Sequence, residues 1–142
     1  MDMFRALQVS ASGMTAQRTR MDVVTENLAN TETTVTASGR PYQRKVVVLR
    51  AADPAFGDAL RAASTPPGGV TVGGVVETDE APRRVLMPGH PQADKDGYVN
   101  MPAVNPLREM LDMMTSTRAY EANATAFQAT KAMSTKLLEL LR

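Results

Sequence analysis

Glycine and proline are confined almost entirely to the middle of this 142-residue chain. All nine prolines lie between Pro41 and Pro106, and eight of the nine glycines lie between Gly39 and Gly97, so that Gly13 is the one exception. Because both residue types interrupt long helices, each end of the chain is free to form one continuous helix. The same residues divide the middle into short strands and turns.

This distribution predicts an α+β fold. We expect helices over residues 2–30 and 106–142, packed as a helical pair, with a small β-rich region between them. The three expected parts are an N-terminal assembly helix at 1–34, a central β-rich region at 35–104 with a loop at 51–69, and a C-terminal assembly helix at 105–142.

Both expected helices carry an apolar stripe with the three-four spacing that places residues on one face. In the C-terminal helix, Asn105 is a good N-cap, Pro106 suits the first helical position, and Glu109 lies early, where it favours the helix dipole. The stripes are the surfaces expected to pack on other helices. They consist of Phe4, Leu7, Ala11, Met14, Met21 and Leu28 in the first helix and of Met110, Met113, Tyr120, Ala124, Phe127 and Leu138 in the second.

These stripes are weak for a coiled coil that has to be stable on its own, because they contain Met, Ala and Thr where such a coil carries Leu and Ile. The chain has no Ile and only 4% aromatic residues, which indicates a thin core. The C-terminal helix would be roughly 55 Å long, longer than a compact domain of this size is wide. Two interpretations remain open: a helical hairpin with a β insertion, or two assembly helices that become ordered only inside a polymer.

Four short β-prone runs lie between the two helices, bounded by Gly, Pro and Asp. They cover residues 46–50, 70–77, 83–87 and 97–101. The pair Gly73-Gly74 interrupts the second run, which indicates a bulge or a sharp bend in that strand.

Composition excludes several classes of function. With 16 basic and 15 acidic side chains, the chain lacks the clustered positive charge that nucleic-acid binding requires, so we expect no nucleic-acid partner. It has no Cys and one His, which leaves no disulfide framework, no thiol nucleophile and no zinc cluster. The longest apolar run, at 46–49, is far too short to span a membrane, and residues 1–30 contain no secretory hydrophobic core. We therefore expect no membrane span and no cleaved signal peptide.

No segment combines the residues that an active site needs. The glycine run at 68–74 lacks the Lys and the Ser or Thr that complete a phosphate-binding loop. The Asp-Lys-Asp-Gly run at 94–97 lacks the further acidic ligands of a calcium loop and is expected to form a hairpin turn. His90 lies beside proline without a nucleophile motif, so we expect a structural turn residue. The sequence predicts no catalytic residue, no metal site and no cofactor, and it does not predict an enzyme.

Three short motifs carry a resemblance to a known family. They are N-L-A-N (Asn27, Leu28, Ala29 and Asn30), P-G-H-P (Pro88, Gly89, His90 and Pro91) and G-Y-V (Gly97, Tyr98 and Val99). Together with segments 39–45 and 118–123, they resemble the axial rod and hook proteins of the bacterial flagellum, most closely the proximal-rod proteins of the FlgC type. N-L-A-N alone is similar to the whole family, whereas the other two motifs select the proximal-rod type. The loop at 51–69 matches no family motif.

The resemblance implies a structural subunit of the flagellar basal-body rod, the drive shaft that transmits torque across the periplasm. It implies as partners further copies of this chain, the other proximal and distal rod proteins, and the base of the rod at the export gate. Export would use the flagellar type III apparatus without a cleaved signal peptide. We expect the terminal segments to order as paired helices when they dock on neighbouring subunits, because apolar burial then offsets the ordering entropy.

Two alternatives from other classes stay open on the residues alone. A helical adaptor, or a needle-like component of another secretion assembly, would also have helical ends and no active site. Such a protein would not need the P-G-H-P and G-Y-V motifs. An enzyme with a split helical frame would need a pocket that contains carboxylates with perturbed pKa values.

Overall fold

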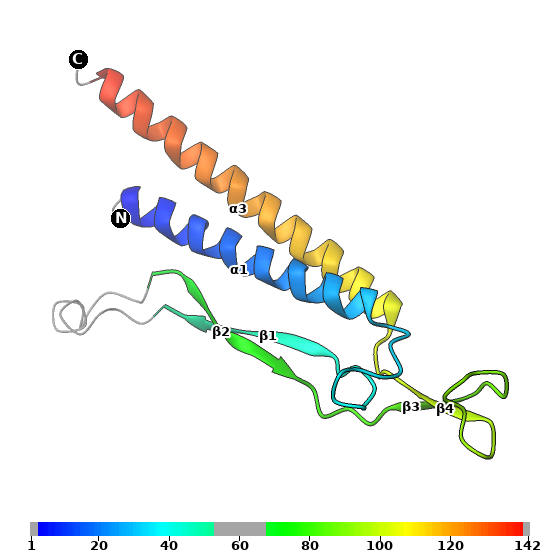
Figure 1. Ribbon diagram of the computed structural model, residues 1–142. Coiled ribbons are helices and arrows are strands. Elements are labelled where there is room, and N and C mark those ends of the chain that lie inside the picture. The colour runs from blue at the N-terminus through cyan, green and yellow to red at the C-terminus, as the bar shows by residue number, and fades with distance from the viewer. Residues whose placement is uncertain (1–2, 53–67, 141–142) are drawn as a thin grey trace.

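The chain folds into two long helices that lie side by side, with β structure along their flank and at one end (Figure 1). The computed structural model describes residues 3–52 and 68–140. Helix α1 covers Met3–Ala29 and helix α3 covers Pro106–Leu140, and the two run antiparallel. The expected α+β fold with a terminal helical pair is confirmed. The pair forms within one chain, as in the helical-hairpin interpretation, and the dependence of helix order on neighbouring subunits stays a prediction.

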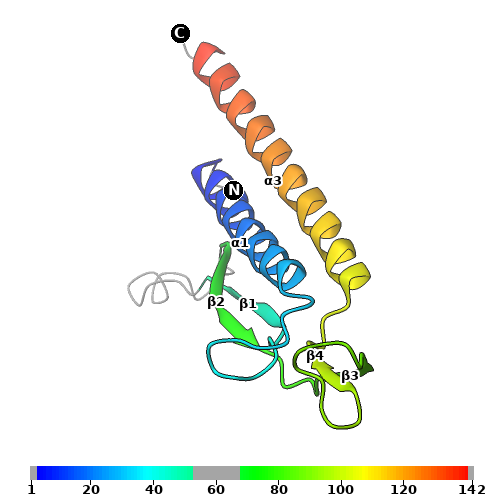
Figure 2. The ribbon, with the colours of Figure 1, turned by 45° about the vertical axis from the view of Figure 1, so that its right-hand side comes forward.

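Helix α3 begins where the sequence predicts. The Asn105 side chain accepts hydrogen bonds from the backbone N–H groups of Leu107 at 3.0 Å and Arg108 at 3.4 Å, and Pro106 takes the first helical position. The 35 residues of α3 extend over about 52 Å, against about 40 Å for the 27 residues of α1. The last turns of α3 therefore run past the beginning of α1 (Figures 1 and 2).

Strands β1 (Lys45–Ala51) and β2 (Val70–Glu77) form an antiparallel two-stranded ribbon. Among the described residues, this ribbon packs along α1 and not on α3. The Ser12 hydroxyl of α1 accepts a hydrogen bond from the backbone N–H of Val70 at 3.1 Å, which fixes the start of β2 to the helix. Helix α1 is thus covered on two sides, by α3 and by the ribbon (Figure 2). Residues 53–67 of the loop expected at 51–69 lie outside the described residues.

A β-bulge interrupts the ribbon at its glycine pair. Val48 of β1 lies opposite Gly74, and Leu49 lies opposite Val72, which leaves Gly73 as the extra residue of β2. The prediction of a bulge or bend at this glycine pair is therefore confirmed.

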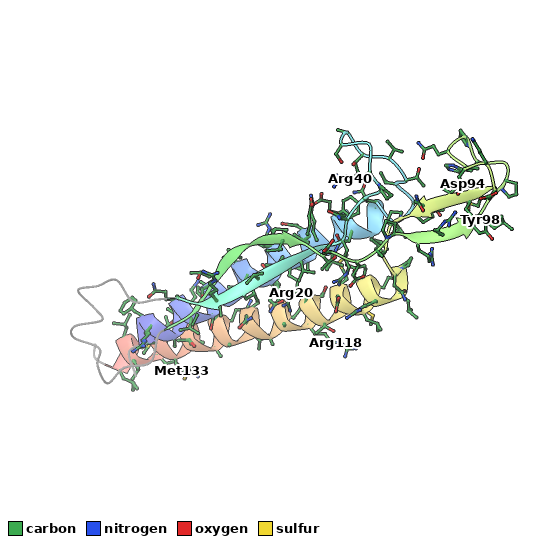
Figure 3. The ribbon with its side chains drawn as sticks, turned by 90° about the horizontal axis from the view of Figure 1, so that it is seen from below. Arg20, Arg40, Asp94, Tyr98, Arg118 and Met133 are labelled. Atoms are coloured by element: carbon green, nitrogen blue, oxygen red, sulfur yellow. The ribbon has the colours of Figure 1, made fainter. Side chains whose placement is uncertain are left out.

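Strands β3 (Arg83–Leu86) and β4 (Tyr98–Met101) form a second antiparallel hairpin, beyond the end where α1 stops and α3 begins (Figure 1). The Asp94 carboxylate closes the turn by accepting hydrogen bonds from the backbone N–H groups of Tyr98 at 2.8 Å and Asp96 at 3.0 Å. The bond from Tyr98 is the largest cause of the lowered pKa of Asp94. The expected hairpin turn is confirmed, and Figure 3 shows Asp94 and Tyr98 at this end of the molecule.

The core is thin and consists mostly of small and medium-sized side chains. They lie on α1, at the start of the ribbon, and on β4 with the residues that follow it. The buried hydrophobic residues are Ala16, Val23, Val24, Tyr42, Val47, Val99, Met101 and Val104. Within the described part of the chain, neither helix is both long and apolar enough to cross a membrane.

The two helices approach closely at Gly13, the single glycine of the terminal segments. A Cβ atom at this position would lie 2.9 Å from Nδ2 of Asn123 on α3, closer than real Cβ contacts allow. Asn123 Nδ2 itself donates a hydrogen bond to the Ala119 carbonyl at 3.0 Å. Gly13 therefore leaves the space that the Asn123 side chain occupies between the helices.

We expect Gly13→Val to lower the free energy of unfolding by about 1–3 kcal/mol, because the added side chain overpacks a closed contact. A second substitution, Asn123→Ala, should recover most of this loss, since it removes the atoms that the new side chain meets. Urea unfolding followed by circular dichroism measures both variants. A Gly13→Val variant as stable as the wild type, or a double variant without recovery, would contradict the close contact.

Candidate assembly interface

The most buried face of α1 is not the apolar stripe of its sequence. The buried residues of α1 are Ser10, Ala16, Val23, Val24 and Asn27, and none of them belongs to the stripe. Because α1 has two neighbours, α3 and the ribbon, its buried surface is rotated away from the stripe toward both of them. The stripe therefore lies at the margin of the helix contact rather than at its centre.

The structure divides the residues expected in the interface into two groups. The half-buried group contains Leu7, Ala11, Met14, Met21 and Leu28 on α1 and Met113, Ala124 and Phe127 on α3. The exposed group contains Phe4, Met110, Tyr120 and Leu138. The half-buried group lies along the helical pair, where for example the Thr117 hydroxyl of α3 lies 3.5 Å from the Met21 sulfur. A role of either group in assembly stays a prediction.

Helix α3 buries polar side chains and exposes apolar ones. Glu109 and Ser116 are its buried residues, whereas Leu107 is 67% exposed and Leu111 is 57% exposed. We define the proximal patch as the exposed apolar residues of the first turns, Leu107, Met110, Leu111 and Met114. Sequence reasoning found only Met110 of this patch, although the i, i+4, i+7 spacing of the other three was a usable signal.

A second exposed apolar group lies at the other end of α3. The Ser134 hydroxyl contacts the Met3 sulfur at the beginning of α1, so the residues after Ser134 extend past the described part of α1. We define the distal patch as Met133, Leu137, Leu138 and Leu140 together with Phe4 at the start of α1. Phe4 is 84% exposed and Leu140 is 82% exposed, and Figure 3 shows Met133 at this end of the molecule.

Asn27, the first residue of the N-L-A-N motif, is 1% exposed and uses every hydrogen-bonding group of its side-chain amide. Its Nδ2 donates to the Lys45 carbonyl at 2.8 Å and to Glu109 Oε2 at 2.9 Å. Its Oδ1 accepts from the Lys45 backbone N–H at 2.9 Å and from the Tyr42 hydroxyl at 2.9 Å. Asn27 thereby connects the end of α1 with the beginning of β1 and the beginning of α3.

The Glu109 carboxylate is fully buried near the beginning of α3. Arg44 Nε donates to its Oε1 at 2.6 Å, and Arg44 Nη2 pairs with Asp112 Oδ2 at 3.2 Å. An unpaired carboxylate at this position would carry a large desolvation cost, so its burial depends on Arg44 and Asn27. We define the joint as the side chains of Asn27, Tyr42, Arg44 and Glu109. Sequence reasoning did not single out Tyr42, Arg44 or Glu109 as functional residues.

The other N-L-A-N residues lie outside the joint. Leu28 is half-buried, Ala29 is exposed and ends α1, and Asn30 follows the helix. Asn30 Nδ2 donates to the Glu26 carbonyl at 2.9 Å, which satisfies a carbonyl group of the last helical turn.

The P-G-H-P motif forms a turn before the tip of the β3–β4 hairpin. The His90 N–H donates to the Met87 carbonyl at 3.0 Å, and its ring nitrogen Nδ1 accepts from the Gln92 N–H at 3.2 Å. The turn role expected for His90 is therefore confirmed. Pro88, Gly89 and Pro91 are exposed around it.

The G-Y-V motif leads from that turn into β4. Gly97 has a φ of 79°, in the left-handed region that favours glycine. The Tyr98 ring lies 4.9 Å from the Arg84 guanidinium, and Val99 is buried on the opposite face of the strand. Both motifs thus shape the hairpin, and within the described residues no three His, Asp or Glu side chains gather to hold a metal ion.

The hydroxyl of Tyr42 has a raised pKa within the joint. Burial is the largest cause, and the carboxylates of Glu26, Glu77 and Glu109 act in the same direction, so that the pKa rises to about 12. Since this value lies above the unfolded value of 10.0, the folded chain holds the proton more tightly than the unfolded chain does. The stabilisation is complete below about pH 10 and is lost as the pH rises toward about 12.

We expect the free energy of unfolding of the wild type to fall between about pH 10 and pH 12 more steeply than that of Tyr42→Phe, which has no proton to lose. Urea unfolding at constant ionic strength measures both slopes. In an ultraviolet absorbance titration, a tyrosine step near pH 12 should be missing from the variant. Identical alkaline slopes in the two proteins would show that the Tyr42 hydroxyl is not held in the joint.

Known proteins match this chain at both helical ends and over its whole length. Residues 7–35 match the family described as flagella basal body rod protein, and residues 95–140 match the family described as flagellar basal body rod FlgEFG protein C-terminal. The flagellar basal-body rod protein FlgC of Bacillus subtilis is 45% identical over 99% of both chains. FlgC of Aquifex aeolicus is 41% identical over 98% of this chain and 97% of its own, and FlgC of Salmonella typhimurium is 36% identical over 99% and 98%.

Matches of this extent favour a rod protein over an adaptor or needle-like component of another secretion assembly. A place in the rod is a structural role rather than an enzymatic one, and it implies assembly with other rod components of the basal body. The chain therefore belongs to the FlgC family of flagellar basal-body rod proteins, and it is a structural subunit of the rod.

Proposed function

We propose that this rod subunit docks on its neighbours through the outer faces of its helical pair, using the proximal patch, the distal patch and the apolar stripe of α1. The observation that carries the proposal is the inverted burial of α3, which buries Glu109 and Ser116 and leaves the leucines and methionines of the two patches exposed. Contact with another subunit would remove Leu107, Leu111 and Leu140 from water, a gain of about 25 cal/mol per Å² of apolar surface.

The two patches lie at opposite ends of α3, so one subunit offers apolar contacts at two levels along its length. Between Met114 and Met133, the exposed residues include the alanines Ala122, Ala126 and Ala129, together with Tyr120 and charged side chains. The distance between packed helices depends on the side chains at the contact. In the stretch of α3 between the two patches, these alanines would therefore let a helix of a neighbouring subunit approach closely. The outer surface of α3 thus suits contact with another helix along most of its length.

The last turns of α3 are the part of the pair whose order depends most on a neighbour. Leu137, Leu138 and Leu140 lie beyond Ser134, where the described part of α1 offers no packing partner. Tertiary packing supplies most of the stability of a helix, and ordering each residue costs about 1–2 kcal/mol. Docking would supply that packing, which is the coupling of folding and assembly that the sequence predicts.

The proposed neighbours are further copies of this chain, the other proximal and distal rod proteins, and the base of the rod at the export gate. In this position the subunit would help the rod transmit torque across the periplasm. The support is that the relatives named rod proteins match nearly all of this chain, and that two separate patches are available for different neighbours.

The proposed export route is the flagellar type III apparatus, without a cleaved signal peptide. The support comes from α1, which begins at Met3 and contributes Ser10 and Ala16 to the buried part of the folded unit. Removal of this segment would take away the partner of α3 and the helix on which the ribbon lies. The proposed route therefore keeps this segment in the finished subunit.

The substitution Leu111→Asp tests the docking surface. In cells whose own copy of the gene is deleted, we expect at least a tenfold loss of the variant from isolated basal bodies, because a charge replaces an apolar contact at the centre of the proximal patch. Ala81→Asp is the matched control, since Ala81 is exposed in the segment between β2 and β3 and belongs to neither helix. Quantitative immunoblots of basal bodies and swimming assays measure the outcome.

Leu111 is 57% exposed, so the purified variant should keep the helical content and thermal midpoint of the wild type. A loss of incorporation without a loss of stability would support docking. Leu138→Asp tests the distal patch in the same way. Normal incorporation and swimming of Leu111→Asp would remove the proximal patch from the proposed interface.

A further inference from the structure

We propose that Asn27 is a positioning residue, which acts through the joint to hold the helical pair and the β1–β2 ribbon at one fixed angle. The fixed angle is a property of the single chain. Its consequence in the rod, a subunit that passes force between its helices and its β region without bending, rests on the proposed function.

Helix α3 is coupled to the ribbon through the joint. Among the described residues, α3 packs on α1 and on neither strand of the ribbon. Arg44 directly precedes β1, and its guanidinium binds the Glu109 carboxylate of α3 at 2.6 Å. The orientation of α3 relative to the ribbon therefore depends on this polar cluster and on α1, which lies between them.

Asn27 binds the backbone of β1 in the way that a neighbouring strand would. Its amide donates to the carbonyl and accepts from the N–H of one residue, Lys45, at 2.8 and 2.9 Å. Two hydrogen bonds to one peptide segment fix both its position and its direction, whereas a single bond would let it rotate. The remaining two bonds of the same amide, to Tyr42 and Glu109, hold the amide plane itself in place.

A second attachment holds the other edge of the ribbon. The Ser12 hydroxyl accepts the Val70 N–H at 3.1 Å, and Ser12 lies on the order of 20 Å from Asn27 along α1. With both attachments present, the ribbon cannot swing on the helix. Loss of the Asn27 side chain would leave Ser12 and the part-exposed ion pair of Lys45 Nζ with Glu26 Oε1, at 2.5 Å, to hold the ribbon on α1. It would also unpair the Lys45 backbone, the Tyr42 hydroxyl and one Glu109 oxygen.

The second asparagine of the motif provides a contrast. Asn30 donates to the Glu26 carbonyl within the last turn of α1 and makes no hydrogen bond to the ribbon or to α3 among the described residues. Its side chain accepts a bond from Thr33 at 3.0 Å. The two asparagines have the same chemistry and lie three residues apart, but only Asn27 connects three elements.

The test uses the absence of cysteine from this chain, which lets spin labels be attached at two introduced cysteines. Val76 on β2 is 55% exposed and Glu121 on α3 is also exposed, so Val76→Cys and Glu121→Cys place one label on each body. Double electron–electron resonance then gives the distribution of distances between the labels in the full chain. We expect Asn27→Ala to widen this distribution at least twofold and Asn30→Ala to leave its width unchanged.

Circular dichroism separates a loss of orientation from a loss of fold. The helical content of Asn27→Ala should stay close to that of the parent, because the contact of α1 with α3 extends far beyond the joint. Should Asn27→Ala fail to fold, Tyr42→Phe gives the answer, since it removes one of the four bonds of Asn27 and keeps the ring. A wider distribution in Tyr42→Phe than in the parent supports the proposal, and an unchanged one overturns it.

A folded Asn27→Ala variant with a distribution as narrow as the parent would overturn the proposal, and so would equal widening by Asn30→Ala. Neither result decides whether the proposed docking surface is correct, because that surface is tested by a different experiment. Spin labels report on the single chain in solution, whereas Leu111→Asp reports on incorporation into basal bodies.

Discussion

The buried carboxylate of Glu109 is the constraint around which the three parts of this subunit are arranged. It can leave water only where Arg44 supplies a charge and Asn27 supplies a donor, which brings together the end of α1, the segment before β1 and the beginning of α3. With these three segments held together, α1 and α3 run antiparallel and strand β1 starts beside the end of α1. The core of the molecule is too thin to impose this arrangement through apolar packing alone.

The two helices reverse the usual distribution of side chains in a helical hairpin. Small and polar residues such as Gly13, Ser116 and Asn123 lie between them. Leucines and methionines such as Leu107, Leu111 and Met114 are exposed, while Met21 and Met113 are half-buried along the pair. An isolated coiled coil would do the opposite, because its stability comes from large apolar side chains in the seam. If neighbours dock as proposed, the outer surface of the pair becomes interior in the rod, and the exposed large side chains would stand at those contacts.

Local rules predict much of this fold, and tertiary contacts decide the rest. The confinement of Gly and Pro, the Asn105 cap and the Gly73-Gly74 pair correctly predict both helices and the bulge, because each acts within a few residues. The buried face of α1 could not be predicted, since it depends on where two other elements pack. An acidic residue such as Glu109 in the first turn of a helix is favourable whether it is exposed or buried. Its partner Arg44 lies 65 residues earlier in the chain, so no local pattern indicates that the Glu109 side chain is buried.

Both the beginning of α1 and the end of α3 lie at one end of the molecule, next to the distal patch (Figure 1). A fluorescent protein or affinity tag fused to either end would occupy the space in which a neighbouring subunit is proposed to lie. The exposed turn at Lys95 and Asp96, in the β3–β4 hairpin, lies at the opposite end of the molecule. Imaging of this subunit in cells therefore calls for an internal label in that turn rather than a terminal fusion.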